Sequence, residues 1–255
     1  MTEARPPRLT AITRATPTVL SVVAGYVDSC TYLGLFRVCV AQLTGSLVLA
    51  GTGFVKSEPG APERLLGIPS FFFASVAVSL LIHSMRERPR AALACSLTIE
   101  CFLLIGLFIS YLAGMPFRDL EAPTAIAAIL FGMAAMGVQS TLVHLLMQGV
   151  ASTNVMTMNT TRLAIDTGKI LVGWIGRNKP DLSQTSKEDY TQARREFAAL
   201  LPLWLGFLAG AALGAVAFVT VGLCCVLFAI LPVGILALWY GERGSRDLGF
   251  LSPTA

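Results

Sequence analysis

Long apolar stretches alternate with short polar ones along most of the chain. A helix that crosses a bilayer needs about 20 mostly apolar residues, because the hydrocarbon core is about 30 Å thick. The stretches that meet this requirement are predicted to be six spanning helices, at 17–36, 67–85, 91–113, 123–147, 197–218 and 221–240. The pattern therefore predicts an all-α fold, a polytopic bundle of membrane helices.

Two further stretches, 43–56 and 156–176, also have helical character but do not fit a span. The first is too short to cross, and the second carries Arg162, Asp166 and Lys169. We therefore predict two short or re-entrant helices. The three charged residues fall on one helix face, so Arg162 and Asp166 can neutralise each other across one turn. The alternative is that Arg162 meets Asp28 or an anionic solute.

The basic residues of the connecting segments predict an orientation. If 43–56 and 156–176 do not cross, one side of the membrane carries most of the Lys and Arg residues. The other side carries only Arg37, Lys56, Arg64 and Arg118. Because cytoplasmic loops are enriched in Lys and Arg, we expect both termini in the cytoplasm. The predicted division is an N-terminal segment 1–14, one transmembrane domain 15–241 with a solvated connector at 177–196, and a tail 242–255.

The N-terminal basic residues followed by an apolar run superficially resemble a secretory signal peptide. The run is too long for that, contains Asp28 and has no clear cleavage site. We therefore expect a retained first helix.

Composition excludes a soluble domain and narrows the partners. The chain is 55% hydrophobic and 13% charged, with a mean hydropathy of +0.70, whereas soluble domains carry about 25% charged residues. The net charge of +4 comes without a long basic run, so nucleic acid is not an expected partner. The expected partners are the lipid bilayer and a small solute. The sequence leaves open whether the chain also associates with further copies of itself. The expected location is the inner (plasma) membrane of a bacterium.

A weak internal repeat joins two polar patches to the two short helices. Gly25 to Asp28 is followed by Leu43-Thr44-Gly45-Ser46, and Gly137 to Ser140 is followed by Thr157-Met158-Asn159. In the six-span arrangement the second copy begins after three crossings and so runs in the opposite direction. The sequence therefore predicts an inverted repeat of three plus three spans, with halves at about 15–114 and 122–241.

The same motifs carry a family resemblance. The chain resembles the YoaK-like family of uncharacterised integral membrane proteins, a domain of unknown function, through Gly25-x-x-Asp28, Thr44-Gly45-Ser46, Met136-Gly137-x-Gln139 and the Thr157 segment. It departs from that family at Ser46, where Asn is usual, and at Met158, where Gly is often found. The resemblance implies a multi-pass protein of about six spans and implies no activity.

Ionisable residues inside apolar spans are the candidates for function. A charge at this depth costs several kcal/mol unless it is paired or hydrated. Asp28 could carry a proton, contact a substrate, or cap a neighbouring broken helix. Glu100 could be proton-linked, or a protonated carboxyl bonded to backbone.

The starts of the two short helices offer positive dipole ends inside the membrane. We therefore predict one midplane substrate site, and small residues that serve packing alone are the alternative. The predicted site residues are Asp28, Thr44, Gly45, Ser46, Gln139, Ser140, Thr157, Asn159 and Arg162, with Asp28 and Glu100 as proton-coupling groups. Gly206, Gly210 and Gly214 are predicted to form a helix-packing ridge.

These patterns favour a secondary transporter or permease for a small polar or anionic solute, with proton coupling as an option. A structural or regulatory membrane protein is the alternative. An intramembrane enzyme is less favoured, because the sequence has no nucleophile–base pair, metal-ligand spacing or phosphate loop. We expect no cofactor, no metal and no enzymatic activity.

Overall fold

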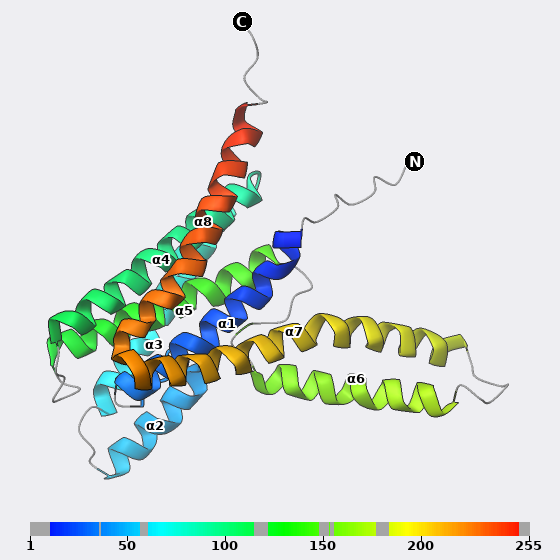
Figure 1. Ribbon diagram of the computed structural model, residues 1–255, viewed down its shortest axis with the longest axis horizontal. Helices are drawn as coiled ribbons and strands as arrows, with labels where there is room; N and C mark the ends of the chain where they lie inside the picture. Colours follow the sequence, from blue (N-terminus) through cyan, green and yellow to red (C-terminus); the bar gives the residue numbers. More distant parts are fainter. Residues whose placement is uncertain are drawn as a thin grey trace, which may run out of the picture.

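The computed structural model describes residues 11–35, 37–56, 61–114, 122–147, 153, 156–176 and 184–249. Their helices are α1 (Ala11–Gly34), α2 (Leu43–Lys56), α3 (Ala61–Ser84), α4 (Pro89–Gly114), α5 (Pro123–Leu146), α6 (Met156–Gly176), α7 (Gln184–Val221), the 3-10 helix η1 (Gly222–Cys225) and α8 (Val226–Gly249). The predicted all-α fold is confirmed (Figure 1).

Among the described residues, five helices are long and apolar enough to cross a membrane. These stretches are Leu65–Ser84 in α3, Pro89–Gly114 in α4, Pro123–Leu146 in α5, Glu188–Val221 in α7 and Val226–Arg243 in α8. The first predicted span, α1, has 24 residues and a length of about 36 Å, but Asp28 and several hydroxyl residues dilute its apolar character. A multi-pass membrane protein is therefore confirmed by helix length and apolarity, whereas the crossing by α1 stays a prediction.

The core lies where α1, α4, α5 and α8 meet. Each of these helices directs a stripe of fully buried apolar side chains inward, represented by Leu20, Leu104, Met136 and Val233. Figure 1 shows that α4 runs opposite to α5 and to α8, and that α1 runs opposite to α5. Near the end of α1, the sulfur atoms of Cys30 and Cys225 are 3.0 Å apart, and both cysteines are free.

The glycine ridge of α7 packs against α1, as predicted. A Cβ atom added to Gly206 would lie 3.2 Å from the Thr18 carbonyl oxygen, and one added to Gly214 would lie 2.5 Å from the Tyr26 carbonyl oxygen. Between these points the backbones are closest where Gly210 meets Val22. Small residues allow such close approach, which favours helix association in membranes. Because both residue series ascend together, α1 and α7 run in parallel.

The pair α3 and α5 repeats this parallel packing elsewhere in the bundle. A Cβ atom on Gly137 would lie 2.6 Å from the Phe71 carbonyl oxygen. The Ser70 hydroxyl donates to the Leu130 carbonyl oxygen at 2.7 Å, and the Ser75 hydroxyl donates to the Gly137 carbonyl oxygen at 3.2 Å. The helices α3 and α5 are therefore joined by close backbone approach and by side-chain hydrogen bonds.

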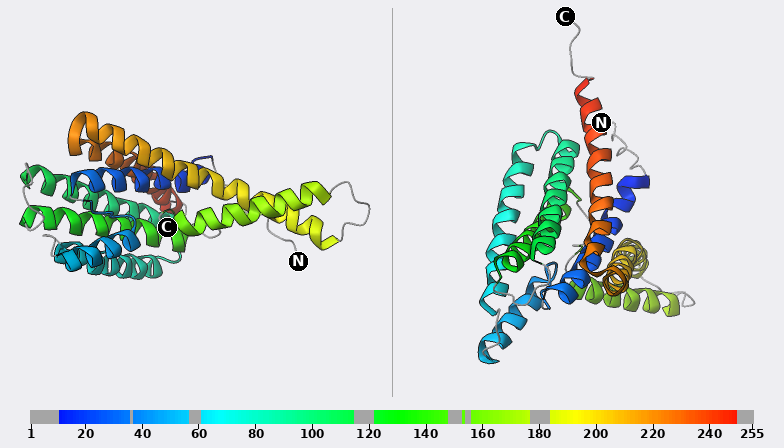
Figure 2. Two further views of the ribbon diagram at one scale, coloured as in Figure 1. Left: turned by 90° about the horizontal axis from the view of Figure 1, so that it is seen from below. Right: turned by 60° about the vertical axis from the view of Figure 1, so that its left-hand side comes forward.

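The helix α6 pairs with the first half of α7, and the two project from the bundle as an arm (Figures 1 and 2). The indole Nε1 of Trp204 donates to the Thr160 hydroxyl at 2.9 Å within this pair. The predicted connector 177–196 is wrong beyond residue 183, because α7 has 38 residues and begins at Gln184. The helices α1 and α8 extend to Ala11 and Gly249, and the limits of the predicted transmembrane domain stay a prediction. The remainder of the predicted terminal segments lies outside the described residues.

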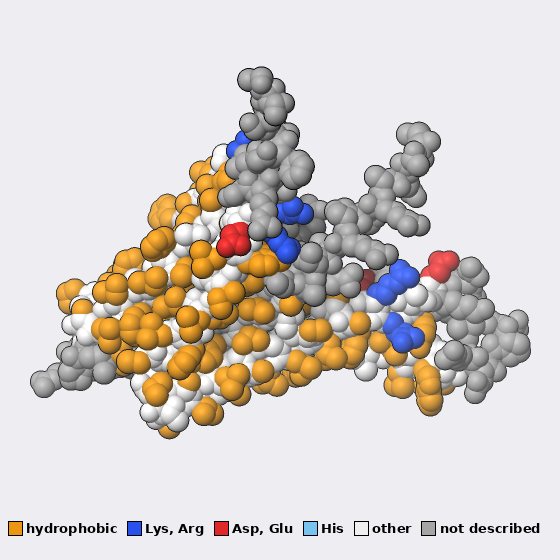
Figure 3. Space-filling model, turned by 45° about the horizontal axis from the view of Figure 1, so that its top comes forward, with side chains coloured by type: hydrophobic (Ala, Val, Ile, Leu, Met, Phe, Trp, Pro, Cys, Tyr) orange, Lys and Arg blue, Asp and Glu red, His pale blue; other side chains and the backbone are white. Residues whose placement is uncertain are grey.

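Basic residues gather at one end of the bundle. The start of α1, the turn between α3 and α4 and the end of α8 lie at the same end (Figure 1). Arg86 and Arg88 are exposed in that turn, Arg90 is exposed at the start of α4, and Arg243 is exposed near the end of α8. In Figure 3 the visible Lys and Arg side chains lie toward this end and the arm, while hydrophobic side chains cover the rest of the face.

Candidate functional site

After α1 the chain turns back into the bundle, and this return brings the backbone at Ala41 to the side chain of Asp28. This carboxyl lies six residues before the end of α1, about 9 Å back along the helix. The backbone N–H of Ala41 donates to Asp28 Oδ1 at 2.9 Å, and the N–H groups of Val40 and Gln42 point to the same carboxyl. Asp28 therefore satisfies the backbone just before α2 begins, which is the capping role left open by the sequence.

The start of α2 is held by a second contact. The Ser46 hydroxyl donates to the Cys39 carbonyl oxygen at 2.6 Å, and Ser46 is fully buried. Thr44 is exposed, whereas Gly45 is half-buried against the side chains of Cys39 and Gln42. The Thr44–Ser46 segment thus begins a helix next to Asp28, as predicted, but its Ser side chain serves the fold of the preceding turn.

A similar return follows α5. The side-chain Nε2 of Gln139 donates to the Thr153 hydroxyl at 3.2 Å and to the Leu20 carbonyl oxygen at 2.8 Å. Gln139 lies seven residues before the end of α5, about 10 Å back along the helix. Gln139 and Thr153 are both fully buried. The chain has therefore returned into the bundle before α6 begins at Met156.

The two returns reach different levels of the bundle. Gln139 meets α1 at Leu20, which lies eight residues from Asp28, about 12 Å along the helix. The structure thus places the polar residues in two clusters, one around Asp28 and one around Gln139, in place of a single compact group. Asn159 is buried near the start of α6, Ser140 is half-buried, and Thr157 is exposed.

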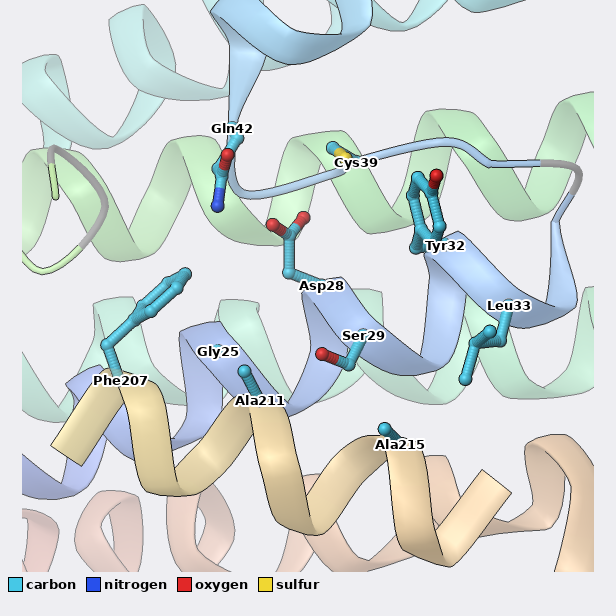
Figure 4. A pocket seen from close by; sticks show the side chains of 10 residues that line it. All are labelled: Gly25, Asp28, Ser29, Tyr32, Leu33, Cys39, Gln42, Phe207, Ala211 and Ala215. Carbon is cyan, nitrogen blue, oxygen red and sulfur yellow. The ribbon is translucent and has the colours of Figure 1, made fainter. Parts of the chain in front are cut away.

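A cavity of about 300 Å³ opens beside Asp28, between α1, α7 and the segment before α2 (Figure 4). It is lined by Gly25, Asp28, Ser29, Tyr32, Leu33, Cys39, Gln42, Phe207, Ala211 and Ala215. In Figure 4 the Asp28 carboxyl points toward the stretch between Cys39 and Gln42, and the Phe207 ring borders the cavity from α7. The cavity combines one carboxyl group, hydroxyl and amide groups, and an apolar wall.

Only Asp28 among the predicted substrate residues lines this cavity. Ser29 and Tyr32 were missed, although Tyr32 follows Asp28 by four residues and so lies on the same side of the helix. Gln42 was missed because a loop residue has no periodicity to place it. Phe207 could have been found from the glycine ridge, because close packing of α7 on α1 brings its neighbours to the same place.

Glu100 is a second buried carboxyl group, within α4. It is fully buried, and neither of its carboxyl oxygens has a hydrogen-bond partner among the described residues. The predicted alternative of a bond to neighbouring backbone is therefore not found there. The side-chain oxygen Oε1 of Gln139 is likewise buried without a partner in the described part of the chain.

The charged residues of α6 share one side of that helix but differ in burial. Asp166 is buried, while Arg162 and Lys169 are exposed. Burial and, to a smaller extent, Glu196 raise the pKa of the Asp166 carboxyl, whereas Lys169 and Arg162 act in the opposite direction. Oδ2 of Asp166 is buried without a hydrogen-bond partner among the described residues, so the predicted pairing of Arg162 with Asp166 stays a prediction. Arg162 does not line the cavity at Asp28. Among the described residues, no group of three or more His, Cys, Asp or Glu side chains could hold a metal ion.

Comparison with known protein families gives one match. Residues 17–239 match the family described as "Protein of unknown function (DUF1275)". No curated protein and no solved structure matches the chain. The match covers most of the chain, including both returns and the cavity at Asp28, and it confirms the resemblance found in the motifs. The chain therefore belongs to the DUF1275 family, the YoaK-like family of multi-pass membrane proteins of unknown function.

Proposed function

We propose that this protein is a secondary transporter or permease that moves a small polar solute through the cavity at Asp28. The observation that carries the proposal is the pair of returns, in which Ala41 reaches Asp28 and Thr153 reaches Gln139. Non-helical backbone at membrane depth is tolerated only where protein buries it or where it lines a cavity. Transporters place their sites at such broken helices near the midplane.

We infer further that the two halves form an inverted repeat. The helices α1 and α5 each have 24 residues and run in opposite directions (Figure 1). Gly25 of α1 packs on the backbone of Phe207 in α7, and Gly137 of α5 packs on the backbone of Phe71 in α3. Each half therefore lends its first helix to the other half in the same manner, which suits rocking of one half against the other.

The negative charge of the Asp28 carboxylate narrows the class of solute that the cavity can bind. Several backbone N–H groups before α2 are already directed to the Asp28 carboxylate. An anion at this position would meet a negative charge and would find these donors occupied. A neutral or cationic polar solute can instead use the hydroxyl of Ser29 and the side chain of Gln42, which also line the cavity. We therefore favour such a solute over the anionic class that the sequence alone left open.

The basic end of the bundle supports the proposed orientation. Cytoplasmic loops are enriched in Lys and Arg, and the exposed arginines of the α3–α4 turn lie at the end where α1 begins and α8 ends. We place this end in the cytoplasm of a bacterial cell, with the chain in its inner membrane.

A structural or regulatory protein is the second candidate, and the Ala41–Asp28 hydrogen bond favours it. In that case Asp28 serves only to hold the chain before α2, and the cavity binds nothing.

Measurements of solute binding and solute uptake by the Asp28→Asn variant distinguish the two candidate functions. The amide retains an oxygen acceptor for the Ala41 N–H, so the fold is kept while the charge is lost. Purified protein is screened for thermal stabilisation by amino acids, sugars, amines and carboxylates, and the stabilising solutes are tested for uptake into proteoliposomes. We expect Asp28→Asn to lose uptake, while Asp189→Asn, on the exposed surface of α7, retains it. Equal uptake by both variants, or stabilisation by no solute, would reject transport at Asp28.

A further inference from the structure

The register of the helices brings Glu100 and Gln139 to one level of the bundle. Gly106 of α4 contacts the ring of Phe131 in α5, and Gly132 of α5 contacts Leu107 in α4. Because α4 and α5 are antiparallel, moving from 106–107 back to Glu100 corresponds to moving from 131–132 forward to residues 137–139. Gln139 therefore lies at the same height along the bundle as Glu100.

Two further helices meet at the same level. Gly234 of α8 contacts Cys101, which follows Glu100 in α4. Gln139 donates to the Leu20 carbonyl oxygen of α1. At this level α4 therefore packs against α5 and α8, and α5 meets α1 at Leu20. The buried side chains Leu20, Met136, Val233 and Leu236 of the neighbouring helices are apolar.

This level contains three buried oxygen atoms that lack a donor among the described residues: both carboxyl oxygens of Glu100 and Oε1 of Gln139. Buried polar atoms in folded proteins almost always have partners. A carboxylate supplies acceptors only, whereas a protonated carboxyl supplies one O–H donor. A proton on Glu100 therefore provides a donor for Gln139 Oε1 and removes a charge that the surrounding apolar side chains cannot stabilise.

We propose that Glu100 and Gln139 form a proton-binding site, in which the protonated Glu100 carboxyl donates to Gln139 Oε1, and that this site couples proton movement to the transport cycle. The coupling role rests on the transport function proposed above, whereas proton binding does not. The Glu100 proton leaves to water when the bundle opens at this level, and the carboxylate takes up a proton before it closes again.

A proton fits this site better than a sodium ion. Metal cations such as Ca²⁺ and Mg²⁺ take six or more oxygen ligands, and Na⁺ has a similar demand. The described buried polar groups near this level are one carboxyl group, one amide oxygen and the Ser96 hydroxyl, which lies one turn before Glu100 and donates to the Ala92 carbonyl oxygen. Among the described residues, the titratable group beside Glu100 is Cys101, the next residue of α4. The helices α5, α8 and α1 present Gln139, Val233 with Leu236, and Leu20 at this level.

Gln139 links this site to the second return. Its Nε2 donates to the Thr153 hydroxyl, while its Oε1 is buried without a partner among the described residues. A proton on Glu100 holds the Gln139 side chain from one side and thereby fixes the chain just before α6. Loss of that proton leaves the amide free to turn, so the charge state of Glu100 and the position of α6 are connected.

Labelling with dicyclohexylcarbodiimide tests the proton site without any solute, because this apolar reagent reacts with protonated carboxyl groups in membranes. The full chain in liposomes is treated across a pH series, and adducts are located by mass spectrometry. We expect an adduct on Glu100 that is lost as the pH rises. The adduct is absent in Glu100→Gln and is kept in Glu87→Gln, whose carboxyl is exposed in the α3–α4 turn.

Three results would overturn the proposal. No adduct on Glu100 at low pH would mean that the carboxyl is ionised or inaccessible. An adduct that does not change with pH would mean a permanently protonated structural group. Loss of the adduct on adding NaCl at constant pH would assign the site to sodium. Glu100→Asp provides a second variant should Glu100→Gln fail to fold. The adduct should persist in Asp28→Asn, so failure of solute transport is distinguishable from failure of the proton site.

Discussion

The Ala41 amide nitrogen lies 2.9 Å from Oδ1 of Asp28, a residue that precedes it by 13 positions. The bond crosses the whole turn between α1 and the start of α2. It explains how a carboxylate can lie in an apolar helix, because backbone donors face it. It also fixes the depth at which α2 begins and hence the wall of the cavity.

Removing the Asp28 acceptor should destabilise the fold. In Asp28→Ala the buried Ala41 N–H has no partner, which costs about 1–3 kcal/mol. Asp28→Asn retains an oxygen acceptor and should lose less. Thermal unfolding of the purified protein in detergent measures both, and Asp189→Ala is the exposed control. Asp28→Ala as stable as the wild type would show that the bond contributes nothing.

A larger side chain at Gly137 should push α3 and α5 apart. In Gly137→Ala the new methyl group meets the Phe71 carbonyl oxygen at 2.6 Å, and overpacking of this kind costs about 1–3 kcal/mol. Gly168→Ala is the matched control, because nothing lies within 4 Å of its added Cβ atom. There alanine should stabilise the helix by about 0.5–1 kcal/mol. The melting temperatures of the two variants should therefore shift in opposite directions.

Breaking the Gln139 contacts should free the segment around Thr153, just before α6. Gln139→Ala removes the donors to Leu20 and Thr153. A cysteine at Thr153, introduced into a background without the native cysteines, should react slowly with maleimide in the wild type and several-fold faster in Gln139→Ala. Ser140→Ala, a change at the adjacent residue, is the control. An unchanged rate would mean that other contacts hold this segment.

Asp166 should make stability depend on pH. Because the pKa of its carboxyl is raised in the folded protein, mainly by burial, the folded state binds the proton more strongly than the unfolded state. The stabilising contribution is present at low pH and falls as the pH rises from the ordinary Asp range through the folded pKa. Asp166→Asn should flatten this dependence in pH-resolved thermal unfolding. Glu188→Gln, at an exposed position of α7, should leave the pH profile unchanged.

The proposed orientation predicts opposite exposure for two basic residues. Single cysteines replace Arg88, in the α3–α4 turn, and Lys56, at the end of α2. An impermeant maleimide applied to right-side-out vesicles should label the Lys56 position and spare the Arg88 position until the membrane is opened. Labelling of both positions from outside would reject the orientation.

The sequence by itself determined the elements and their environment. Apolar stretches of sufficient length predicted five of the candidate spans, and the starts of α2 and α6 fall where the polar patches predicted. These features are local, because helix length and apolar composition follow from neighbouring residues. The sequence overextended the connector before α7, since a polar helix and a polar loop have similar composition.

Only the tertiary structure decided which polar groups meet. Asp28 was recognised from its depth in an apolar run, but its partner Ala41 is an ordinary apolar residue whose N–H is shared by every backbone. The cavity needs Phe207 and Ala211 of α7, which the glycine ridge places on some helix surface without saying that this helix is α1. The common level of Glu100 and Gln139 depends on the register of antiparallel helices, which close packing at Gly106 and Gly132 sets. Hydrophobicity selects the helices, whereas close packing at glycines selects their register.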